Sequence, residues 1–198
     1  MDSKILSRLI DIVFGKDVDV ATICGYTDAQ LLRATLCAEA KGESDAGKRA
    51  VLNVIINRST TYHGESNTHP MYRGSNRVSI AILRKWQFSC WNSTSTCALF
   101  KEAYKKAVED CDIAMTTADY TVFEGATDAQ AKKILHYINP KTATSREWWV
   151  QQVKTQSNAH PTDTSWIANL PSSKLGTTSI IWRFWRIGNH VFVSGPAL

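Results

Sequence analysis

The residue best suited to acid–base chemistry is Glu39, which lies within the segment Ala38-Glu39-Ala40-Lys41-Gly42-Glu43. If this segment is helical, Glu39 shares a face with Leu32, Thr35 and Leu36. A carboxyl group among apolar and small side chains is partly desolvated, and we expect desolvation to raise its pKa. A general acid needs such a pKa near neutral pH. The spacing therefore permits Glu39 to act as a general acid.

Other interpretations of the acidic residues compete with this one. Glu39 is also placed to form a helix-surface pair with Arg33 or Lys41. Glu43, four residues further on, falls within the separation of a two-carboxylate glycosidase if the helix continues past Gly42. Glycine weakens a helix, however, so Glu43 could instead brace the following loop. The residues by themselves leave these alternatives open.

Metal-dependent and nucleophilic hydrolysis lack their usual motifs. The five histidines are scattered along the chain: His63, His69, His136, His160 and His190. They form no H-E-x-x-H or comparable spacing, so we expect neither a metal nor a cofactor. No serine or cysteine lies in a recognisable nucleophile elbow or triad motif.

The oxidation state of the cysteines depends on the cell compartment in which the protein resides. They are five, an odd number without a C-x-x-C pair: Cys24, Cys37, Cys90, Cys97 and Cys111. The N-terminal residues lack a basic region followed by a long apolar stretch, so we expect no signal peptide and a protein made in the cytoplasm. Because thiols stay reduced there, we predict that most cysteines are free, with Cys37 a buried thiol.

The chain of 198 residues carries a net charge of +5, which favours a polyanionic partner. Nucleic acid, an anionic membrane and a bacterial wall all fit this description. No apolar run approaches the roughly 20 residues of a membrane span, so we expect no stable membrane insertion. Lys and Arg are dispersed and no nucleic-acid motif is present, so we expect no nucleic-acid partner. We also expect the protein to be a monomer. A non-catalytic basic module that binds wall polymer or nucleic acid is the alternative from another class.

Along the whole chain, the periodicity of apolar residues predicts an α+β fold whose first part is helical. The predicted helices cover 3–14, 27–40, 45–58, 78–85, 98–111 and 129–133. Strands are predicted at 135–140, 179–186 and 190–193, the last two forming a hairpin that turns at Gly188-Asn189. Residues 59–77 and 154–178 are predicted loops. We expect residues 1–25 to be an amphipathic helix and linker, and 26–198 to form one catalytic domain.

Several short motifs occur in a characteristic order. They are Ala38–Ser44 with Gly47, Ala50–Val54 and Asn57-Arg58; Gln87-Phe88-Ser89; Tyr137-Ile138-Asn139-Pro140 with Ala143-Thr144-Ser145; and Ile187–Phe192. In this order they resemble the A-E-A-R-G-E, N-R, Q-F-S, Y-x-N-P and I-G-x-H-x-F motifs of the SleB-type cell wall hydrolases, which include spore cortex-lytic enzymes and phage lysins. The similarity spans roughly residues 28–192.

The resemblance implies a mainly helical domain, similar to lysozyme and lytic transglycosylases, with a small C-terminal antiparallel β element. It implies cleavage of peptidoglycan between N-acetylmuramic acid and N-acetylglucosamine by a lytic transglycosylase with Glu39 as its acid. A hydrolytic muramidase that uses Glu39 with Glu43 or Asp45 is the alternative. The chain also resembles a phage endolysin, which would reach the wall in the periplasm after release and lyse the host.

The resemblance further indicates which residues hold the substrate. The predicted substrate-binding residues are Glu43, Trp86, Gln87, Ser89, Tyr137, Asn139, Ser145 and His190. Structural roles compete for several of them, with Asn139-Pro140 as a turn, Ser89 and Ser145 as caps, and His190 as a packed histidine. The tandem Trp148-Trp149 and the pair Trp182 and Trp185 could stack on sugar rings, although tryptophan more often packs in a core.

Overall fold

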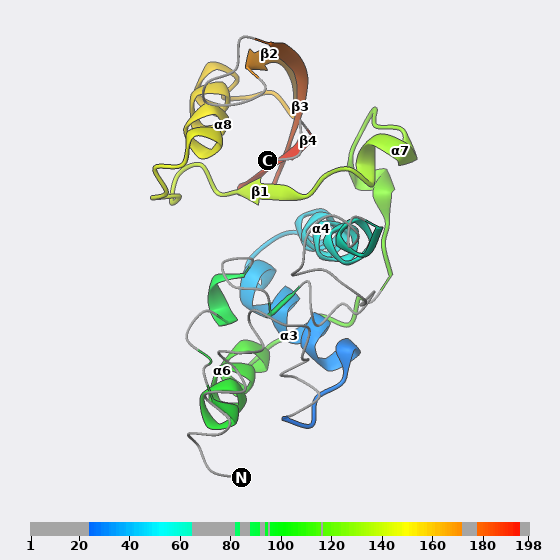
Figure 1. The fold of residues 1–198 in the computed structure, drawn as a ribbon, viewed down its shortest axis with the longest axis vertical. Helices are drawn as coiled ribbons and strands as arrows, with labels where there is room; N and C mark the ends of the chain where they lie inside the picture. Colours follow the sequence, from blue (N-terminus) through cyan, green and yellow to red (C-terminus); the bar gives the residue numbers. More distant parts are fainter. Residues whose placement is uncertain are drawn as a thin grey trace. The chain divides into compact units, whose positions relative to one another are not determined.

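The computed structural model describes residues 24–64, 82–83, 88–91, 94, 96–115, 117–171 and 178–194, with the backbone alone for 60–64. These residues combine helices with one antiparallel sheet, so the predicted α+β class is confirmed (Figure 1). They form two compact units. The first comprises the described residues up to Lys41 and from Arg58 to Thr117, and the second comprises Gly42–Asn57 and the described residues from Ala118 onward. The predicted helix 3–14 lies outside the described residues, as does most of 78–85.

In the first unit, two helices pack side by side, α3 (Asp28–Ala40) and α6 (Cys97–Val108). Helix α3 begins where the sequence predicts a helix, and a capping box of Thr27 and Gln30 starts it because the two side chains satisfy free amides of the first turn. Most of α3 is buried, and its small and aliphatic side chains allow this close packing.

Two disulfides fasten these helices at both ends. Cys24, just before α3, is bonded to Cys97 at the start of α6, while Cys37 in the last turns of α3 is bonded to Cys111 just after α6. The prediction of mostly free thiols is therefore wrong, and Cys90 alone is free. Spacing could not reveal the pairs, because their partners are 73 and 74 residues apart and only the packing of α3 on α6 brings them together.

Helix α4 (Asp45–Gly64) begins after Ser44, whose hydroxyl accepts a hydrogen bond from the amide of Gly47. Its buried residues include Ala50, Val51, Leu52, Val54 and Ile55. The predicted end at Arg58 is wrong, and the first residues of the predicted loop 59–77 are helical. Polarity suggested a loop there, but neither proline nor glycine interrupts residues 59–63, so the helix continues to Gly64.

The second unit contains a four-stranded antiparallel sheet in the order β1-β4-β3-β2. Its strands are β1 (His136–Ile138), β2 (Ser165–Pro171), β3 (Ser179–Ile187) and β4 (His190–Ser194). The predicted hairpin is confirmed: β3 and β4 turn at Gly188-Asn189, where Gly188 has a φ of 60°. Glycine adopts this left-handed conformation without steric cost.

Helix α8 (Trp148–Ala159) packs on one face of this sheet through Val153, against Trp166, Trp182, Phe184 and Val191. The end of α8 and all of β2 fall within the predicted loop 154–178, so that prediction is wrong for those residues. Their apolar residues are widely spaced among polar ones, and burial depends on partners elsewhere in the chain. On the other face, the ring of Phe123 contacts Trp185 and Phe192.

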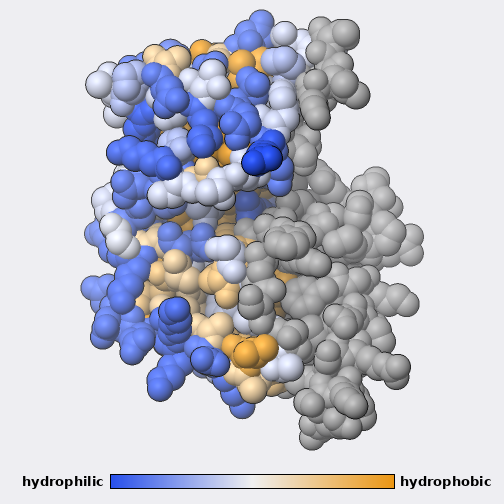
Figure 2. All heavy atoms as spheres, turned by 90° about the vertical axis from the view of Figure 1, so that its left-hand side faces the viewer, coloured by the Kyte–Doolittle hydropathy of each residue, from blue (hydrophilic) through white to orange (hydrophobic). Residues whose placement is uncertain are grey.

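Trp182 and Trp185 are buried to 1% exposure or less, so both pack in the core instead of offering a face to sugar rings. The short helices η3 (Tyr120–Val122) and α7 (Asp128–Ala131) precede the sheet in the chain. Hydrophilic residues dominate the described surface in the view of Figure 2, with smaller apolar areas between them. Of the helices described, none has the length and apolarity that crossing a membrane would require.

Candidate active site

Glu39 lies in the last turn of α3, half-buried between the exposed Ala38 and the buried Ala40. Thr35, one turn earlier on the same face, is fully buried, and its hydroxyl donates to the carbonyl of Leu31 (2.8 Å). The neighbouring Cys37 is fixed by its disulfide. The carboxyl group of Glu39 therefore projects from a rigid helix end and is partly shielded from water.

A short 3-10 helix, η2 (Ser89–Trp91), packs against α3 near this carboxyl group. The indole N–H of Trp91 donates to the hydroxyl of Thr35 (2.9 Å), and both side chains are buried. The next residue back, Cys90, is hydrogen-bonded through its thiol to Glu39. The sequence interpretation missed Cys90, although its position directly after Gln87-Phe88-Ser89 was a usable signal.

Burial raises the pKa of the Cys90 thiol well above its ordinary value, and the negative charge of Glu39 raises it further. The thiol therefore stays protonated at neutral pH and is not a nucleophile there. A protonated thiol is a weak hydrogen-bond donor, and a carboxylate can only accept. The pair thus consists of a neutral donor and an acidic residue.

Arg33 and Lys41, the competing partners predicted for Glu39, bind backbone carbonyls. The guanidinium of Arg33 donates to the carbonyls of Cys111 (2.8 Å) and Ile113 (3.0 Å). The ammonium of Lys41 donates to the carbonyl of Glu109 (2.7 Å). Arg33 in the middle of α3 and Lys41 at its C-terminal end therefore hold this helix to the end of α6 and the chain that leaves it, which adds to the rigidity around Glu39.

Two of the quoted motifs meet in the first unit. The guanidinium of Arg58 lies over the ring of Phe88, 4.9 Å from its centroid, and both side chains are buried. A cation over an aromatic face is attractive, more so when both are desolvated. This contact links Asn57-Arg58 to Gln87-Phe88-Ser89. Ser89 itself is exposed on η2, whereas the predicted site residues Trp86 and Gln87 lie outside the described residues.

In the second unit, Glu43 is bound to the β3–β4 turn. Its carboxylate accepts from the backbone amide of Asn189 (3.0 Å) and from the side-chain amide of Asn189 (2.9 Å), and its side chain is only 8% exposed. A Cβ atom at Gly188 would overlap this carboxylate, and one at Gly47 would approach the Glu43 Cβ to 2.9 Å. Since α3 ends at Ala40, the helix does not continue through Gly42. Glu43 thus fixes the hairpin.

His190 lies beside Glu43, and Tyr137 packs on His190. The Nδ1 atom of His190 is 3.5 Å from the Glu43 carboxylate and makes no hydrogen bond within the described part of the chain. The His190 ring meets the Tyr137 ring edge to face, with centroids 5.1 Å apart. Burial lowers the pKa of His190, which the charge of Glu43 partly offsets. His190 is therefore neutral at neutral pH.

Asn139 and Ser145, two other predicted site residues, form local turns. The Asn139 side-chain oxygen accepts from the amides of Lys141 (3.0 Å) and Thr142 (3.4 Å). The Ser145 hydroxyl accepts from the amide of Glu147 (3.2 Å), just before α8. These bonds are typical of side chains that shape turns and helix starts. The structure thus gathers Glu43, Tyr137 and His190 at one place in the second unit.

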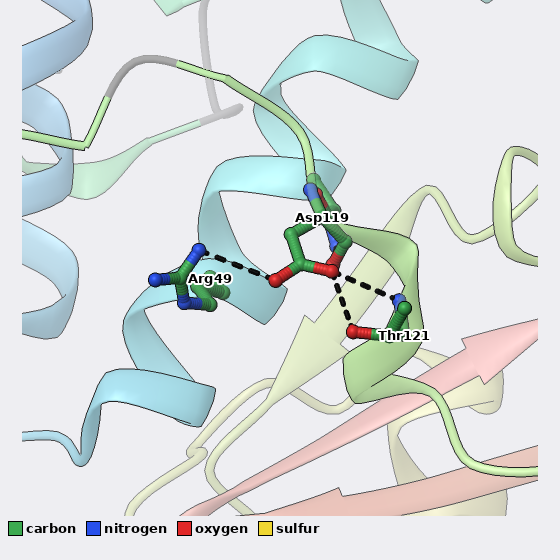
Figure 3. A network of polar contacts seen from close by, with 4 residues as sticks. Arg49, Asp119 and Thr121 are labelled. Atoms are coloured by element: carbon green, nitrogen blue, oxygen red, sulfur yellow. Dashed lines mark hydrogen bonds and ion pairs between the residues drawn. The ribbon is translucent and has the colours of Figure 1, made fainter.

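The asparagines of the quoted α4 motifs have structural roles that sequence reasoning missed. The Asn53 amide donates to the carbonyl of Asp119 (2.6 Å), and the Asp119 amide donates back to Asn53 (2.9 Å). The Asp119 carboxylate accepts from Thr121 and pairs with Arg49 at 3.2 Å, as Figure 3 shows. The hydrogen bonds from Thr121 and the charge of Arg49 lower the pKa of Asp119. Asp119 is therefore an anchor carboxylate in its ionised form.

Asn57, one helical turn after Asn53, is buried and fully engaged. Its amide donates to the carbonyls of Ala131 (2.8 Å) and Ile134 (3.0 Å), and its oxygen accepts from the hydroxyl of Tyr120 (2.7 Å). A buried amide with its partners in place stabilises one specific packing. Both asparagines therefore fasten α4 to the segment that leads into β1.

The residues that the structure describes contain no group of three or more His, Cys, Asp or Glu side chains arranged to hold a metal ion. A family model described as Cell Wall Hydrolase matches residues 42–161, more than half of the chain. The match includes Glu43, Asn139 and Ser145 and begins at Gly42, just after Glu39. No curated protein matches the chain, and no solved structure matches it.

Proposed function

The chain belongs to the cell wall hydrolase family, and from this premise we propose that it cleaves peptidoglycan between N-acetylmuramic acid and N-acetylglucosamine as a lytic transglycosylase. Membership of the family makes it an enzyme that acts on the cell wall. The observation that supports the finer proposal is Glu39: a half-buried carboxyl group at the end of a helix fixed by two disulfides. A fixed, partly desolvated acid suits the protonation of a glycosidic oxygen.

In the proposed reaction, protonated Glu39 gives its proton to the oxygen that links the two sugars, and the bond from this oxygen to C1 of the muramic acid breaks. Positive charge then develops at C1. The Glu39 carboxylate takes the proton from the 6-hydroxyl of the same sugar, and this oxygen bonds to C1. The products are a chain with a 1,6-anhydro end and a chain with a free 4-hydroxyl. No water is consumed, and Glu39 ends the cycle protonated.

A hydrolytic muramidase needs a second carboxylate to activate water. Of the two candidates for this carboxylate, Glu43 accepts two hydrogen bonds from Asn189, and Asp45 pairs with Lys48 at 3.4 Å. These bonds occupy acceptor positions that a general base needs for water. This is why we favour the reaction with one carboxyl group, and product analysis discriminates between the two.

We also propose that the enzyme works on the outer side of the cytoplasmic membrane and serves host lysis as a phage endolysin. Disulfides form and persist in oxidising compartments such as the periplasm, and this chain has two. Its net charge of +5 favours association with an anionic wall. Tyr137 and His190 remain the proposed substrate contacts of the second unit, with Glu43 holding their hairpin.

The test compares Glu39→Gln with the unsubstituted protein on purified murein, followed by loss of turbidity and by mass spectrometry of the products. We expect the substitution to lower the rate by about 10²–10⁴-fold, since it removes the proton donor. Glu102→Gln is the matched control, because Glu102 is an exposed carboxylate on α6 of the same unit. It should leave both the rate and the unfolding temperature unchanged.

The products decide the mechanism. Muramic acid ends that are one water lighter than reducing ends indicate a transglycosylase, whereas reducing ends indicate a muramidase. Full lytic activity in a folded Glu39→Gln variant would show that the acid is another residue.

A further inference from the structure

Cys90 is the one cysteine outside the two disulfides, and its thiol faces the proposed acid. Its place is set by η2, which the buried hydrogen bond from Trp91 to Thr35 fastens to α3. Thr35 and Glu39 are four residues apart on one helix face. Cys90, the residue before Trp91 on this fastened element, is hydrogen-bonded through its thiol to Glu39.

While Glu39 is ionised, the hydrogen bond between Cys90 and Glu39 has one possible direction. The thiol is buried next to a negative charge, and both influences keep it protonated. A carboxylate accepts hydrogen bonds and cannot donate them. The sulfur therefore donates its proton to a hydrogen bond with Glu39.

We propose that Cys90 is a positioning residue that orients the Glu39 carboxylate and stabilises its ionised form during turnover. This inference rests on the proposed function of Glu39 as acid and base. A carboxyl group on a flexible side chain samples several rotamers, and a partner on a second, buried element selects one of them. The bond is made to the ionised form, in which Glu39 must take the proton from the 6-hydroxyl. Cys90 itself neither touches the sugar nor forms a covalent bond.

Two consequences separate positioning from a structural role. Without the donor, the ionised form of Glu39 loses stabilisation, so Glu39 should keep its proton to higher pH and the alkaline limit of activity should move upward. The Glu39 carboxyl group would also be less well oriented during turnover, whereas substrate binding would be unchanged. The turnover number should therefore fall with an unchanged KM.

The experiment measures rates on soluble glycan fragments of murein against pH for the unsubstituted protein, Cys90→Ala and Cys90→Ser. We expect Cys90→Ala to lower kcat about tenfold, the effect of one lost hydrogen bond to a charged group. Its KM should stay within twofold, and its activity should persist to higher pH. Cys90→Ser restores a donor of similar size, so it should recover most of the kcat and the original alkaline limit.

Several outcomes would overturn the proposal. Unchanged kcat and pH profile in Cys90→Ala would do so. Equal losses of kcat in Cys90→Ala and Cys90→Ser, explained by a lower unfolding temperature alone, would also do so. If Cys90→Ala does not fold, the comparison is made with Cys90→Ser and Cys90→Val, of which only serine can donate.

The Glu39→Gln variant distinguishes this failure from failure of the proposed function. Activity in Glu39→Gln refutes the role of Glu39, and the inference falls with it. An inactive Glu39→Gln together with an unaffected Cys90→Ala refutes the positioning role alone.

Discussion

Glu43 and Asn189, 146 residues apart in the chain, are joined by two hydrogen bonds that fix the β3–β4 turn. The turn carries Gly188 against the Glu43 carboxylate and places His190 beside it. An acidic residue that sequence reasoning offered as a substrate contact or second catalytic carboxylate is thus engaged with the protein's own backbone. A structural role for Glu43 has consequences that can be measured.

We expect Glu43→Ala to lower the free energy of unfolding by about 1–3 kcal/mol, because it removes both acceptors and leaves a gap beneath the turn. Glu43→Gln keeps the volume and one acceptor, so it should cost less. Urea unfolding measures both effects. Glu43→Gln should also retain most of the murein cleavage. If it abolished cleavage with unchanged stability, Glu43 would have a chemical role and the muramidase alternative would gain support.

Gly188→Ala should destabilise the protein more than Gly125→Ala. Both glycines have positive φ values, of 60° and 72°, so alanine costs about 1 kcal/mol of backbone strain at either position. At Gly188 the added Cβ also overlaps the Glu43 carboxylate, whereas at Gly125 nothing lies within 4 Å. Thermal unfolding provides the comparison.

A double-mutant cycle isolates the overlap. Combined with Glu43→Ala, the Gly188→Ala substitution should cost less than it does alone, because the obstructing carboxylate is gone. Strictly additive losses would contradict the close approach of Gly188 to Glu43.

Reduction should destabilise the first unit strongly. Each disulfide closes a loop of more than 70 residues, for which the chain-entropy model gives about 4 kcal/mol of stabilisation. We expect a reducing agent to lower the unfolding temperature, and to have no such effect on a variant with serine at all four bridged positions. Alkylation of the denatured, unreduced protein should modify one cysteine, Cys90. More than one modified cysteine would contradict the two bridges.

The stability should fall as the pH drops below about 6.5, the ordinary pKa of histidine. Burial lowers the pKa of His190 in the folded state, so the unfolded chain binds the proton more readily between the two pKa values. Its contribution is therefore fully present above pH 6.5 and lost as the pH falls toward the folded pKa. His190→Gln should remove this part of the pH dependence, which urea unfolding between pH 5 and 8 would detect.

His160→Gln is the matched control for this titration. His160 is more exposed and pairs with Asp163 at 2.8 Å, in contrast to the desolvated His190. This variant should keep the loss of stability at low pH that is assigned to His190. An unchanged pH dependence in His190→Gln would contradict the assignment.

Local chemistry alone determined much of the fold. The start of α3 next to Thr27, the start of α4 at Asp45 and the turn at Gly188-Asn189 each depend on residues within a few positions, and the sequence predicted all three correctly. Short-range signals failed where burial depends on distant partners. Residues 165–171 became β2 only because β3 offers a ladder of hydrogen bonds, and Trp166 finds its place against Phe184.

For the candidate site, the order of the motifs and their resemblance to the wall hydrolases proposed Glu39 as the acid. Only the tertiary structure decided what surrounds these residues. The packing of α3, η2 and α6 pairs the four bridged cysteines and leaves Cys90 against Glu39, and the return of β4 places Asn189 on Glu43. Such contacts join residues tens to more than a hundred positions apart. A side chain's role there follows from packing geometry, which no local pattern encodes.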